Sequence, residues 1–502
     1  MKELNFFTKK QTLGQLYSLQ VLLAFVILPI YCNSQPKKEI TSSPTPTSST
    51  PSEIKFHVKY TDSVIALTNL RVIKGDGKTV SEIQTIIIAG NKIQSIQNTS
   101  NAQIPPSAKI INLKGHTALP GLIGMHNHLF YPSFIDDNGK PSNQQMNFSF
   151  PRLYLAFGVT TIRTAGGSMV ESEINLKHEI DSGISPGPRI YITSPFMEGP
   201  GGIKEMPVIR TENEAEQFVN FWADRGINSI KLYTHLSPNV AMAASRTAKQ
   251  RNLKVLGHLC TISFDEAIEM GVNDLQHGFV VNTGFAKNKR HGQCPGNSFG
   301  SLANVYVQSE QANQLIQKLI KKNIAVTSTL AIFENYTPQP TQLTDDMLAV
   351  LCQASKENVL KQRQAVLAQG QNGFDKILEK EMKLEYAFVK AGGLLLSGVD
   401  PGGNGATLPG FGDHRQIELL VKAGFSPLEA IKIATYNGAL YLNELNNIGT
   451  LESGKLADIL IVQGNPVENI SDIRNVKLVF KNGYAYDQKI LLNSVKGQVG
   501  FR

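Results

Sequence analysis

Two histidines separated by one residue close an apolar run, a spacing that could hold a metal ion. His126 and His128 follow the apolar residues 121–125. Because side chains alternate between faces along a strand, both imidazoles would point to the same side and could bind one ion together. His-x-His pairs also occur by chance, so this pair alone is a weak indication of a metal site.

A lysine stands in another apolar stretch. Lys231 lies within residues 229–233, where a buried ammonium group is costly and tends to lose its proton. A neutral lysine amine can react with carbon dioxide to form a carbamate, an anion whose two oxygens can bridge two metal ions. The alternative is a lysine at a strand end whose amine reaches solvent.

Three more polar residues each end a short apolar strand. They are His258, His277 and Asp400. Taken singly, each histidine is more often a hydrogen-bonded structural residue, and Asp400 could cap the turn at 401–403. Together with the His-x-His pair they favour a metal site, in which Asp400 could also take a proton from bound water. Tyr233 lies two residues beyond the lysine and would share its face, either to polarise a substrate carbonyl or to pack as an aromatic.

Such residues need a scaffold on which several strand ends meet. Between residues 121 and 435, short apolar strands alternate with helical stretches, which is typical of repeated βα units. Eight strands with helical connections predict a (β/α)8 barrel, whose active sites lie at the C-terminal strand ends. The predicted strands are 119–125, 159–162, 189–192, 229–233, 255–258, 274–277, 324–327 and 394–399, and the predicted helices include 215–225, 264–270 and 312–322. A helical stretch at 347–388 could form a lid over the mouth.

The rest of the chain divides into four parts. Residues 55–115 and 443–502 contain short alternating strands and predict a small β-sandwich built from both chain ends, with the barrel, residues 116–442, inserted between them. Residues 1–32 predict a signal peptide, because lysines precede an apolar run too short to span a membrane comfortably. Residues 33–54 are rich in Ser, Thr and Pro and predict a disordered tether.

The order of leader, cysteine and polar tether resembles the start of a bacterial lipoprotein. Cys32 would carry the lipid, although the bulky Tyr31 stands where such cleavage sites usually have a small residue. We therefore expect export, to the periplasm or to a membrane surface. This N-terminal anchor would be the only contact with a membrane.

Composition narrows the class of protein. Hydrophobic residues make up 41% of the chain and charged residues 18%, which permits a large globular core. The net charge of +8 comes without a basic block interleaved with aromatics, so we expect no nucleic-acid partner. Cys260, Cys294 and Cys352 are too few for a disulfide framework, and Cys260 is expected to be a small buried apolar residue. A single bridge and a homo-oligomer both remain compatible with the sequence.

The ordered set His-x-His, Lys, His, His, Asp on successive strands resembles the metal-dependent amidohydrolase superfamily. Within it, the sequence is most similar to the imidazolonepropionase-like and Xaa-Pro dipeptidase-like branch. Matching segments extend from Ala66 to Gly483 and include 119–123, 158–161, 185–189, 423–427 and 449–458.

This resemblance implies a (β/α)8 barrel with a small β-sandwich and a site for two divalent metal ions, with zinc as the first expectation. It places His126, His128 and Asp400 at one ion, His258 and His277 at the other, and a carbamylated Lys231 between them. Two positions depart from the family pattern: Gly124 and Thr164 both stand where relatives commonly have aspartate.

The expected activity is hydrolysis of an amide bond in a small-molecule substrate, such as a dipeptide. Arg163, His414 and Arg415 could hold a substrate carboxylate, or could be a structural strand-end residue and the start of a solvated helix. A cyclic amide or N-acyl compound is an alternative substrate. Alternatively, the protein could be a non-catalytic surface lipoprotein that scavenges metal ions. Lys231 and Asp400 argue against this alternative, because metal capture needs neither a bridging group nor a proton shuttle.

Overall fold

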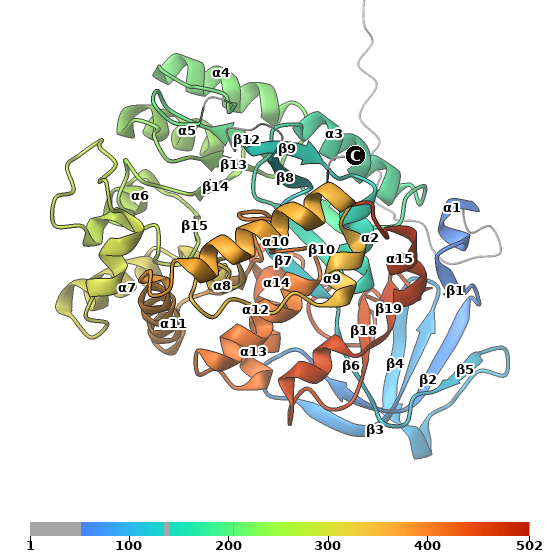
Figure 1. Ribbon diagram of the computed structural model, residues 1–502. Coiled ribbons are helices and arrows are strands. Elements are labelled where there is room, and N and C mark those ends of the chain that lie inside the picture. The colour runs from blue at the N-terminus through green and yellow to red at the C-terminus, as the bar shows by residue number, and fades with distance from the viewer. Residues whose placement is uncertain (1–51, 135–140, 204, 501–502) are drawn as a thin grey trace, which may run out of the picture. The chain divides into compact units, whose positions relative to one another are not determined.

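The computed structural model describes residues 52–134, 141–203 and 205–500. The predicted leader and nearly all of the predicted tether lie outside these residues. The described chain is built around parallel strands wrapped by helices, next to a sheet that joins the two chain ends (Figure 1).

Nine short strands, all paired in parallel, take the eight predicted strand positions. They form a three-stranded sheet in the order β11-β10-β7 and a six-stranded sheet in the order β12 to β17. The strand predicted at 189–192 is β11, and β12 begins directly after it but pairs in the other sheet. The strands are β7 (Leu122–Asn127), β10 (Val159–Thr164), β11 (Arg189–Tyr191), β12 (Thr193–Met197), β13 (Ser229–Leu232), β14 (Lys254–Gly257), β15 (Asp274–Gln276), β16 (Ala325–Ser328) and β17 (Leu395–Ser397).

The two parallel sheets meet at both edges through a few hydrogen bonds. At one edge Thr193 N donates to Thr164 Oγ1 at 3.0 Å. At the other edge Val399 N and Asp400 N donate to His126 O at 3.2 and 2.8 Å. Among the described strands no ladder pairs β17 with β7. The structure therefore shows parallel βα units in the order of a barrel, without a continuous closed ladder.

The parallel strands are buried on both faces. Every residue of β7, β10 and β13 is buried, as expected where helices cover the outside and side chains fill the inside. The helices between or after these strands are α2 (Ser149–Ala156), α3 (Val170–Asp181), α4 (Glu212–Ala223), α5 (Pro238–Gln250), α6 (Phe264–Met270), α7 (Glu310–Lys321), α8 (Leu330–Glu334), α12 (Phe411–Lys422), α13 (Pro427–Ile433) and α14 (Tyr436–Tyr441). The helix predicted at 264–270 is α6, with the same bounds.

Local sequence explains where α6 begins and ends. Ser263 and Glu266 form a capping box, in which each side chain accepts from the backbone N–H of the other residue. Gly271 ends the helix in a left-handed conformation with φ 75°. These ends matter to the site because the strand before α6 leads into His258 and the strand after it leads into His277.

The two chain ends join in one nine-stranded sheet (Figure 1). β6 pairs with β18 on one side and with β2 on the other, so the strands from both chain segments form one continuous sheet. The sequence had predicted a β-sandwich, in which two separate sheets pack face to face. β6 belongs to this sheet, although residues from 116 onward were expected to belong to the barrel. The strands are β1 (Val58–Tyr60), β2 (Val64–Ile73), β3 (Val80–Ala89), β4 (Lys92–Asn98), β5 (Lys109–Asn112), β6 (His116–Pro120), β18 (Ile459–Gln463), β19 (Val476–Lys481) and β20 (Tyr484–Tyr486).

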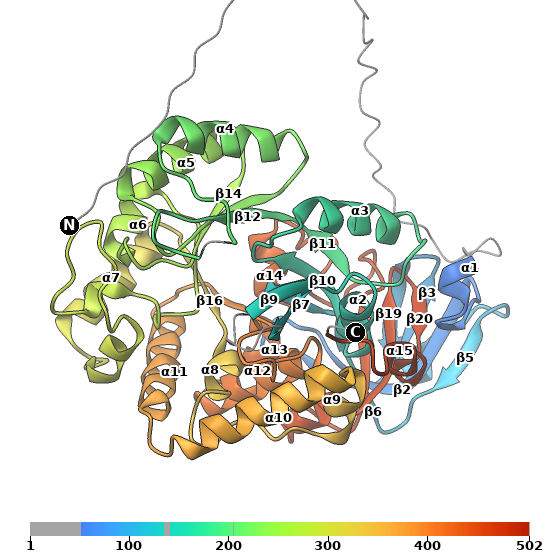
Figure 2. The ribbon, with the colours of Figure 1, turned by 45° about the horizontal axis from the view of Figure 1, so that its top comes forward.

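The predicted lid region contains three helices, α9 (Asp345–Val350), α10 (Gln353–Ala368) and α11 (Phe374–Lys390). Figure 2 shows α10 on the outside of the helical layer and α11 beside α8. α10 contacts the loop after β17, since a Cβ added to Gly405 would lie 3.0 Å from Val359. α11 instead packs on β17 as a helix of the βα units.

A disulfide joins Cys260 to Cys294, with their Cα atoms 4.8 Å apart. Cys260 is buried, as expected, and it forms the bridge that the sequence left open, because its partner lies in a loop 34 residues further along the chain that folds back beside it. Within the described ranges, no helix is both long and apolar enough to cross a membrane.

Candidate metal centre

The six predicted ligands come together at the C-terminal ends of the parallel strands. His126 lies on β7 and Lys231 on β13, while His258 and His277 come directly after β14 and β15. The imidazole centroid of His277 is 4.3 Å from that of His126 and 4.3 Å from that of His258. Asp400, three residues after β17, faces the histidine cluster.

Asp400 faces the His-x-His pair at distances that suit a shared metal ion. Its Oδ1 is 3.5 Å from His126 Nε2 and 3.1 Å from His128 Nε2. Ligand atoms about 2.0–2.1 Å from a tetrahedral zinc ion lie roughly 3.3 Å from each other. The Nδ1–H of His128 donates to Gly166 O at 2.9 Å, so in the neutral ring Nε2 is the nitrogen that can bind a metal.

Two of the predicted ligands have an unusual backbone. His277 has φ 66° and Asp400 has φ 50°, both in the left-handed region that non-glycine residues seldom adopt. Gln276 turns its side chain inward, where its Oε1 accepts from Lys231 Nζ. An extended residue 277 would therefore face the opposite way, and the left-handed turn brings the imidazole back to the cluster. Such strain is found mainly at functional sites.

The electrostatics of the cluster favour metal binding. Burial lowers the pKa of His258 to about 3 and that of His126 well below its usual range, with Lys231 adding to both shifts. Burial also lowers the pKa of Lys231 to about 7. Burial alone would raise the pKa of Asp400, but the facing His126 and His128 hold it well below its ordinary value. Neutral imidazoles and an ionised carboxylate are the forms that bind divalent metals.

The residues of the cluster therefore fit divalent metal ions. Ligand atoms of His126, His277 and Asp400 all lie within 4.8 Å of one another. The buried Nδ1 of His126 has no hydrogen-bond partner in the described structure, which is costly for a polar atom unless a ligand supplies one. The ligand set contains nitrogen and oxygen but no thiolate, which suits zinc, manganese or cobalt.

Tyr233 lies at the edge of this cluster. Its ring is 4.9 Å from that of His258 and 4.8 Å from that of Phe196. Burial, together with the nearby Asp400, raises the pKa of Tyr233, so its hydroxyl keeps its proton. A protonated, half-buried phenol can donate a hydrogen bond to a carbonyl oxygen beside the metals.

Arg163 does not lie at the mouth. It is 1% exposed inside β10, and its guanidinium bonds Asp274 Oδ2 at 2.5 Å and also contacts Met125 O. Tyr441 lies under the guanidinium, with its ring centroid 5.2 Å from Arg163 Cζ. The prediction that Arg163 holds a substrate carboxylate is therefore wrong, because the strand continues past it to Thr164 and its charge is paired within the interior.

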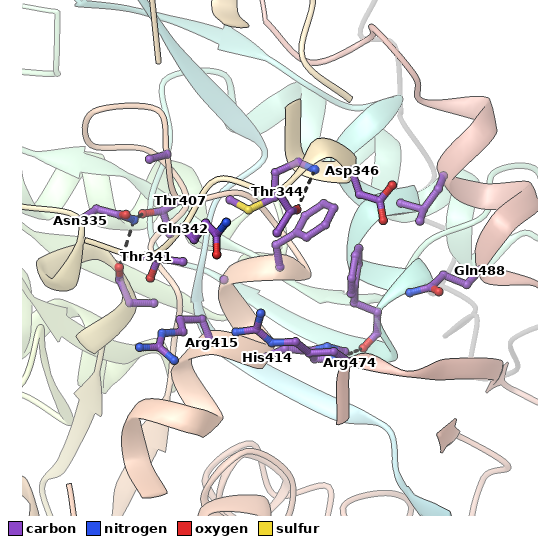
Figure 3. A pocket seen from close by; sticks show the side chains of 17 residues that line it. Asn335, Thr341, Gln342, Thr344, Asp346, Thr407, His414, Arg415, Arg474 and Gln488 are labelled. Carbon is purple, nitrogen blue, oxygen red and sulfur yellow. Dashed lines mark hydrogen bonds between the residues drawn. The ribbon is translucent and has the colours of Figure 1, made fainter. Parts of the chain in front are cut away.

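His414 and Arg415 also lie away from the ligand cluster. The Nε2–H of His414 donates to Phe157 O at 2.7 Å, and Arg415 pairs with Glu334 at 2.6 Å and Glu418 at 2.7 Å. Both residues line a cavity of about 210 Å3 between α12 and the loop before α9, shown in Figure 3. None of the six candidate ligands lines this cavity. The prediction that His414 and Arg415 bind the substrate at the mouth is wrong, because the loop after β17 sets the start of α12 apart from Asp400.

Gly124, the first departure from the family pattern, has a direct structural consequence. A Cβ at Gly124 would lie 2.4 Å from Asn127 Nδ2, so the side chain of Asn127 occupies the space that a larger residue at 124 would need. Asn127 Nδ2 is 3.5 Å from Asp413 Oδ1, and Asp413 Oδ2 accepts from Gly410 N at 2.8 Å. A carboxylate therefore still lies behind the His-x-His pair, but it comes from α12.

Thr164, the second departure, also has a buried acid nearby. Glu173 on α3 is 0% exposed, its carboxyl lies against Gly167, and neither carboxyl oxygen has a hydrogen-bond partner among the described residues. Burial raises the pKa of Glu173 to about 8. The loop that it supports includes Gly166, whose carbonyl orients His128.

The sequence analysis missed three features beside the cluster. They are the contact of Gln276 with Lys231, the contact of Thr329 with His277, and the disulfide next to His258. Thr329 Oγ1 is 3.1 Å from His277 Nδ1. The only signal for Gln276 was its place one residue before a candidate ligand. Cys260 follows His258 by two residues, but no spacing rule identifies Cys294 as its partner.

The amidohydrolase family profile matches residues 117–485, and the chain belongs to the amidohydrolase family. Among proteins with curated descriptions, none matches the sequence significantly. Similar solved structures include a Xaa-Pro dipeptidase with bound methionine in the active site, 20% identical with a TM-score of 0.63, over 85% of this chain and 100% of that one.

Two further structures have the same fold. A prolidase complexed with N-methylphosphonate-L-proline is 18% identical with a TM-score of 0.60, over 84% of this chain and 99% of that one. A bottromycin amidohydrolase is 15% identical with a TM-score of 0.63, over 86% of this chain and 91% of that one. The resemblance to Xaa-Pro dipeptidase-like amidohydrolases is confirmed for the family and the fold. The chain is a metal-dependent hydrolase of the amidohydrolase type with an additional β domain.

Proposed function

We propose that the protein is an exported hydrolase with two divalent metal ions, on a (β/α)8 barrel, that cleaves an amide C–N bond of a small substrate. The observation that carries this proposal is the convergence of four imidazoles, Lys231 and Asp400 in a buried cluster. His126, His128 and Asp400 would hold one ion, and His258 and His277 the other. When bound, ions in this position activate water and polarise the scissile carbonyl.

Lys231 would bridge the two half-sites as a carbamate. Its amine is fully buried, and its pKa is lowered to about 7, so a large neutral fraction is present near neutral pH. In the step that forms the carbamate, the nitrogen lone pair attacks carbon dioxide, an N–C bond forms as one C=O π pair moves onto oxygen, and the nitrogen loses a proton to water. The product is an anion whose two oxygens could each face one of the half-sites.

Proton transfer is assigned to Asp400 and carbonyl orientation to Tyr233. Asp400 is ionised and faces the histidine cluster, so it can take the proton of the attacking water and return it to the leaving nitrogen. Tyr233 keeps its proton and can donate a hydrogen bond to the carbonyl oxygen as negative charge develops there.

The substrate class is tested most directly with dipeptides. We propose Xaa-Pro dipeptides as the first candidates, supported by the similarity of fold to a Xaa-Pro dipeptidase and a prolidase. Protein loaded with zinc would be assayed against Xaa-Pro dipeptides, N-acyl amino acids and lactams, with Asp400→Asn as the inactive control. Turnover of no amide by metal-loaded protein would refute the proposal. Equal kcat/KM for a dipeptide and its C-terminal amide would show that no residue recognises the carboxylate.

Export is supported by the disulfide. Structural disulfides persist in oxidising compartments and are rare in the cytosol of most organisms. Cys260–Cys294 therefore agrees with the leader predicted at residues 1–32. Labelling of Cys32 by a lipid analogue in cells would distinguish a lipoprotein from a periplasmic form, and a full-length cytosolic chain would refute export.

A further inference from the structure

Two buried glutamates on α11 lie behind the turn that carries His277, outside the ligand set. Glu381 and Glu385 are one helical turn apart and face the same way, with 1% and 0% of their surfaces exposed. Their carboxyl groups lie beside each other against Gly278, and burial raises the pKa of both, that of Glu385 to about 7. Fully buried glutamates are rare unless paired, so this carboxyl pair needs an explanation.

Glu381 contacts the backbone of the His277 turn directly. Phe279 N donates to both of its carboxyl oxygens, at 2.8 and 2.9 Å. Gly278 has φ 61°, and a Cβ there would lie 1.6 Å from Glu381 Oε1. A side chain at residue 278 would therefore clash with Glu381, whose carboxyl group occupies the space beside Gly278.

Glu385 holds the neighbouring strand end. Ser328 Oγ lies 2.8 Å from Glu385 Oε2 and 2.7 Å from Gln416 Nε2, so it can donate to the carboxylate while it accepts from the amide. The next residue, Thr329, lies with its Oγ1 3.1 Å from His277 Nδ1. The carboxyl pair thus reaches His277 by two routes, through the backbone at Phe279 and through the end of β16.

The turn needs such support because its backbone is strained. His277 and Gly278 are both left-handed, and a left-handed non-glycine residue persists only where its surroundings hold it. Without that conformation the imidazole would leave the cluster, because Gln276 before it already faces Lys231. The orientation of this candidate ligand therefore depends on contacts outside the cluster.

We propose that Glu381 and Glu385 form a positioning pair that holds His277 in the conformation required for binding the second metal ion. This inference rests on the proposed function, and it adds the residues that orient one ligand. Loss of a supporting partner of a metal ligand typically lowers metal affinity about 10- to 100-fold. We expect an effect of this size for Glu381→Ala, with a lower kcat and little change in KM.

The experiment compares three variants on the same helix. Glu381→Ala removes the acceptor of Phe279 N–H. Glu381→Gln keeps an oxygen for that N–H and offers an amide proton to Glu385, so it should behave like the wild type. Leu384→Ala truncates a side chain that is 0% exposed and makes no polar contact, so it measures the effect of destabilising the helix alone.

Three readouts separate positioning from stability. Zinc retained against a competing chelator measures affinity, and the visible spectrum of the cobalt-substituted protein reports ligand geometry. Hydrogen exchange at the Phe279 amide is measured in metal-free protein and does not depend on turnover. We expect weaker metal binding, an altered spectrum and faster exchange in Glu381→Ala, but not in Glu381→Gln or Leu384→Ala.

The outcomes separate this inference from the function on which it rests. Equal zinc affinity in Glu381→Ala and the wild type would overturn the positioning role and leave the hydrolase proposal standing. A wild-type protein that takes up no metal would overturn the proposed function. If Glu381→Ala does not fold, Glu385→Ala tests the same role through Ser328, and unchanged metal affinity in that variant would overturn it equally.

Discussion

Reduction of the Cys260–Cys294 disulfide is expected to destabilise the protein and to weaken metal binding at the same time. Cys260 follows His258 by two residues, and the loop closed by the bridge contains His277. Opening this loop removes a constraint from the unfolded chain and frees the two segments that carry the histidines of one half-site.

The size of the effect follows from the length of the closed loop. In the chain-entropy description, the bridge removes about 2.1 + 1.5R ln n cal/mol/K from the unfolded state. For the sequence separation of 34 this amounts to about 4 kcal/mol at 25 °C. Lys289 Nζ also donates to Thr261 O at 2.6 Å, so the two segments keep one link in the folded state after reduction.

Urea unfolding with and without reductant measures this effect. The double variant Cys260→Ser with Cys294→Ser should show the lower midpoint in both conditions, and the reduced wild type should match it. Cys352→Ser removes the free cysteine of the described residues and should keep the wild-type response to reductant. A wild-type midpoint that does not move, after thiol titration has verified full reduction, would refute the reasoning.

Three further predictions concern individual residues. Lys231→Ala should lose the second metal ion by elemental analysis, and bicarbonate should speed metal reconstitution of the wild type only; full metal content in the variant would make Lys231 an ordinary buried residue. Asp400→Asn should lower kcat by about 10²–10⁴-fold with little change in KM, and a change confined to KM would reassign Asp400 to substrate binding. Because burial raises the pKa of Glu173 from 4.5 to about 8, the folded state binds the proton more tightly than the unfolded state, and the stability linked to it falls as pH rises from 4.5 through about 8. Glu173→Gln should therefore gain stability relative to the wild type at pH 8 but not at pH 4, as measured by urea unfolding, and an equal difference at both pH values would contradict the shift.

The candidate ligands could be predicted because their positions follow from a simple rule. Each stands at the end of a short apolar strand, and in parallel βα units such ends meet on one face. His126, Lys231 and His258 needed only this rule. His277 also stands at a strand end, but the rule alone would have pointed its side chain away from the cluster, because the preceding Gln276 already points inward to Lys231. The left-handed backbone of His277 turns its imidazole back toward the other ligands.

The substrate-binding residues could not be predicted in the same way. Arg163 stands one residue before the end of β10, as His126 and Lys231 do in their strands, but its guanidinium is held in the interior by Asp274, a partner 111 residues further along the chain. His414 lies beyond a loop whose path no local pattern describes. Both predictions depended on the place of a side chain at a loop, where local sequence constrains direction least.

The sequence alone determined the order of the candidate metal ligands, the alternation of strands and helices, and the strand-rich character of the two segments that flank the barrel region. These features are local, because hydrophobic periodicity and residue type act over a few neighbouring positions. Tertiary structure decided which distant groups meet. It paired Cys260 with Cys294, placed Asp274 beneath Arg163, and brought Glu381 and Glu385 against the His277 turn. Such contacts join residues far apart in the chain, and their partners are selected by packing and by the need to satisfy buried polar groups.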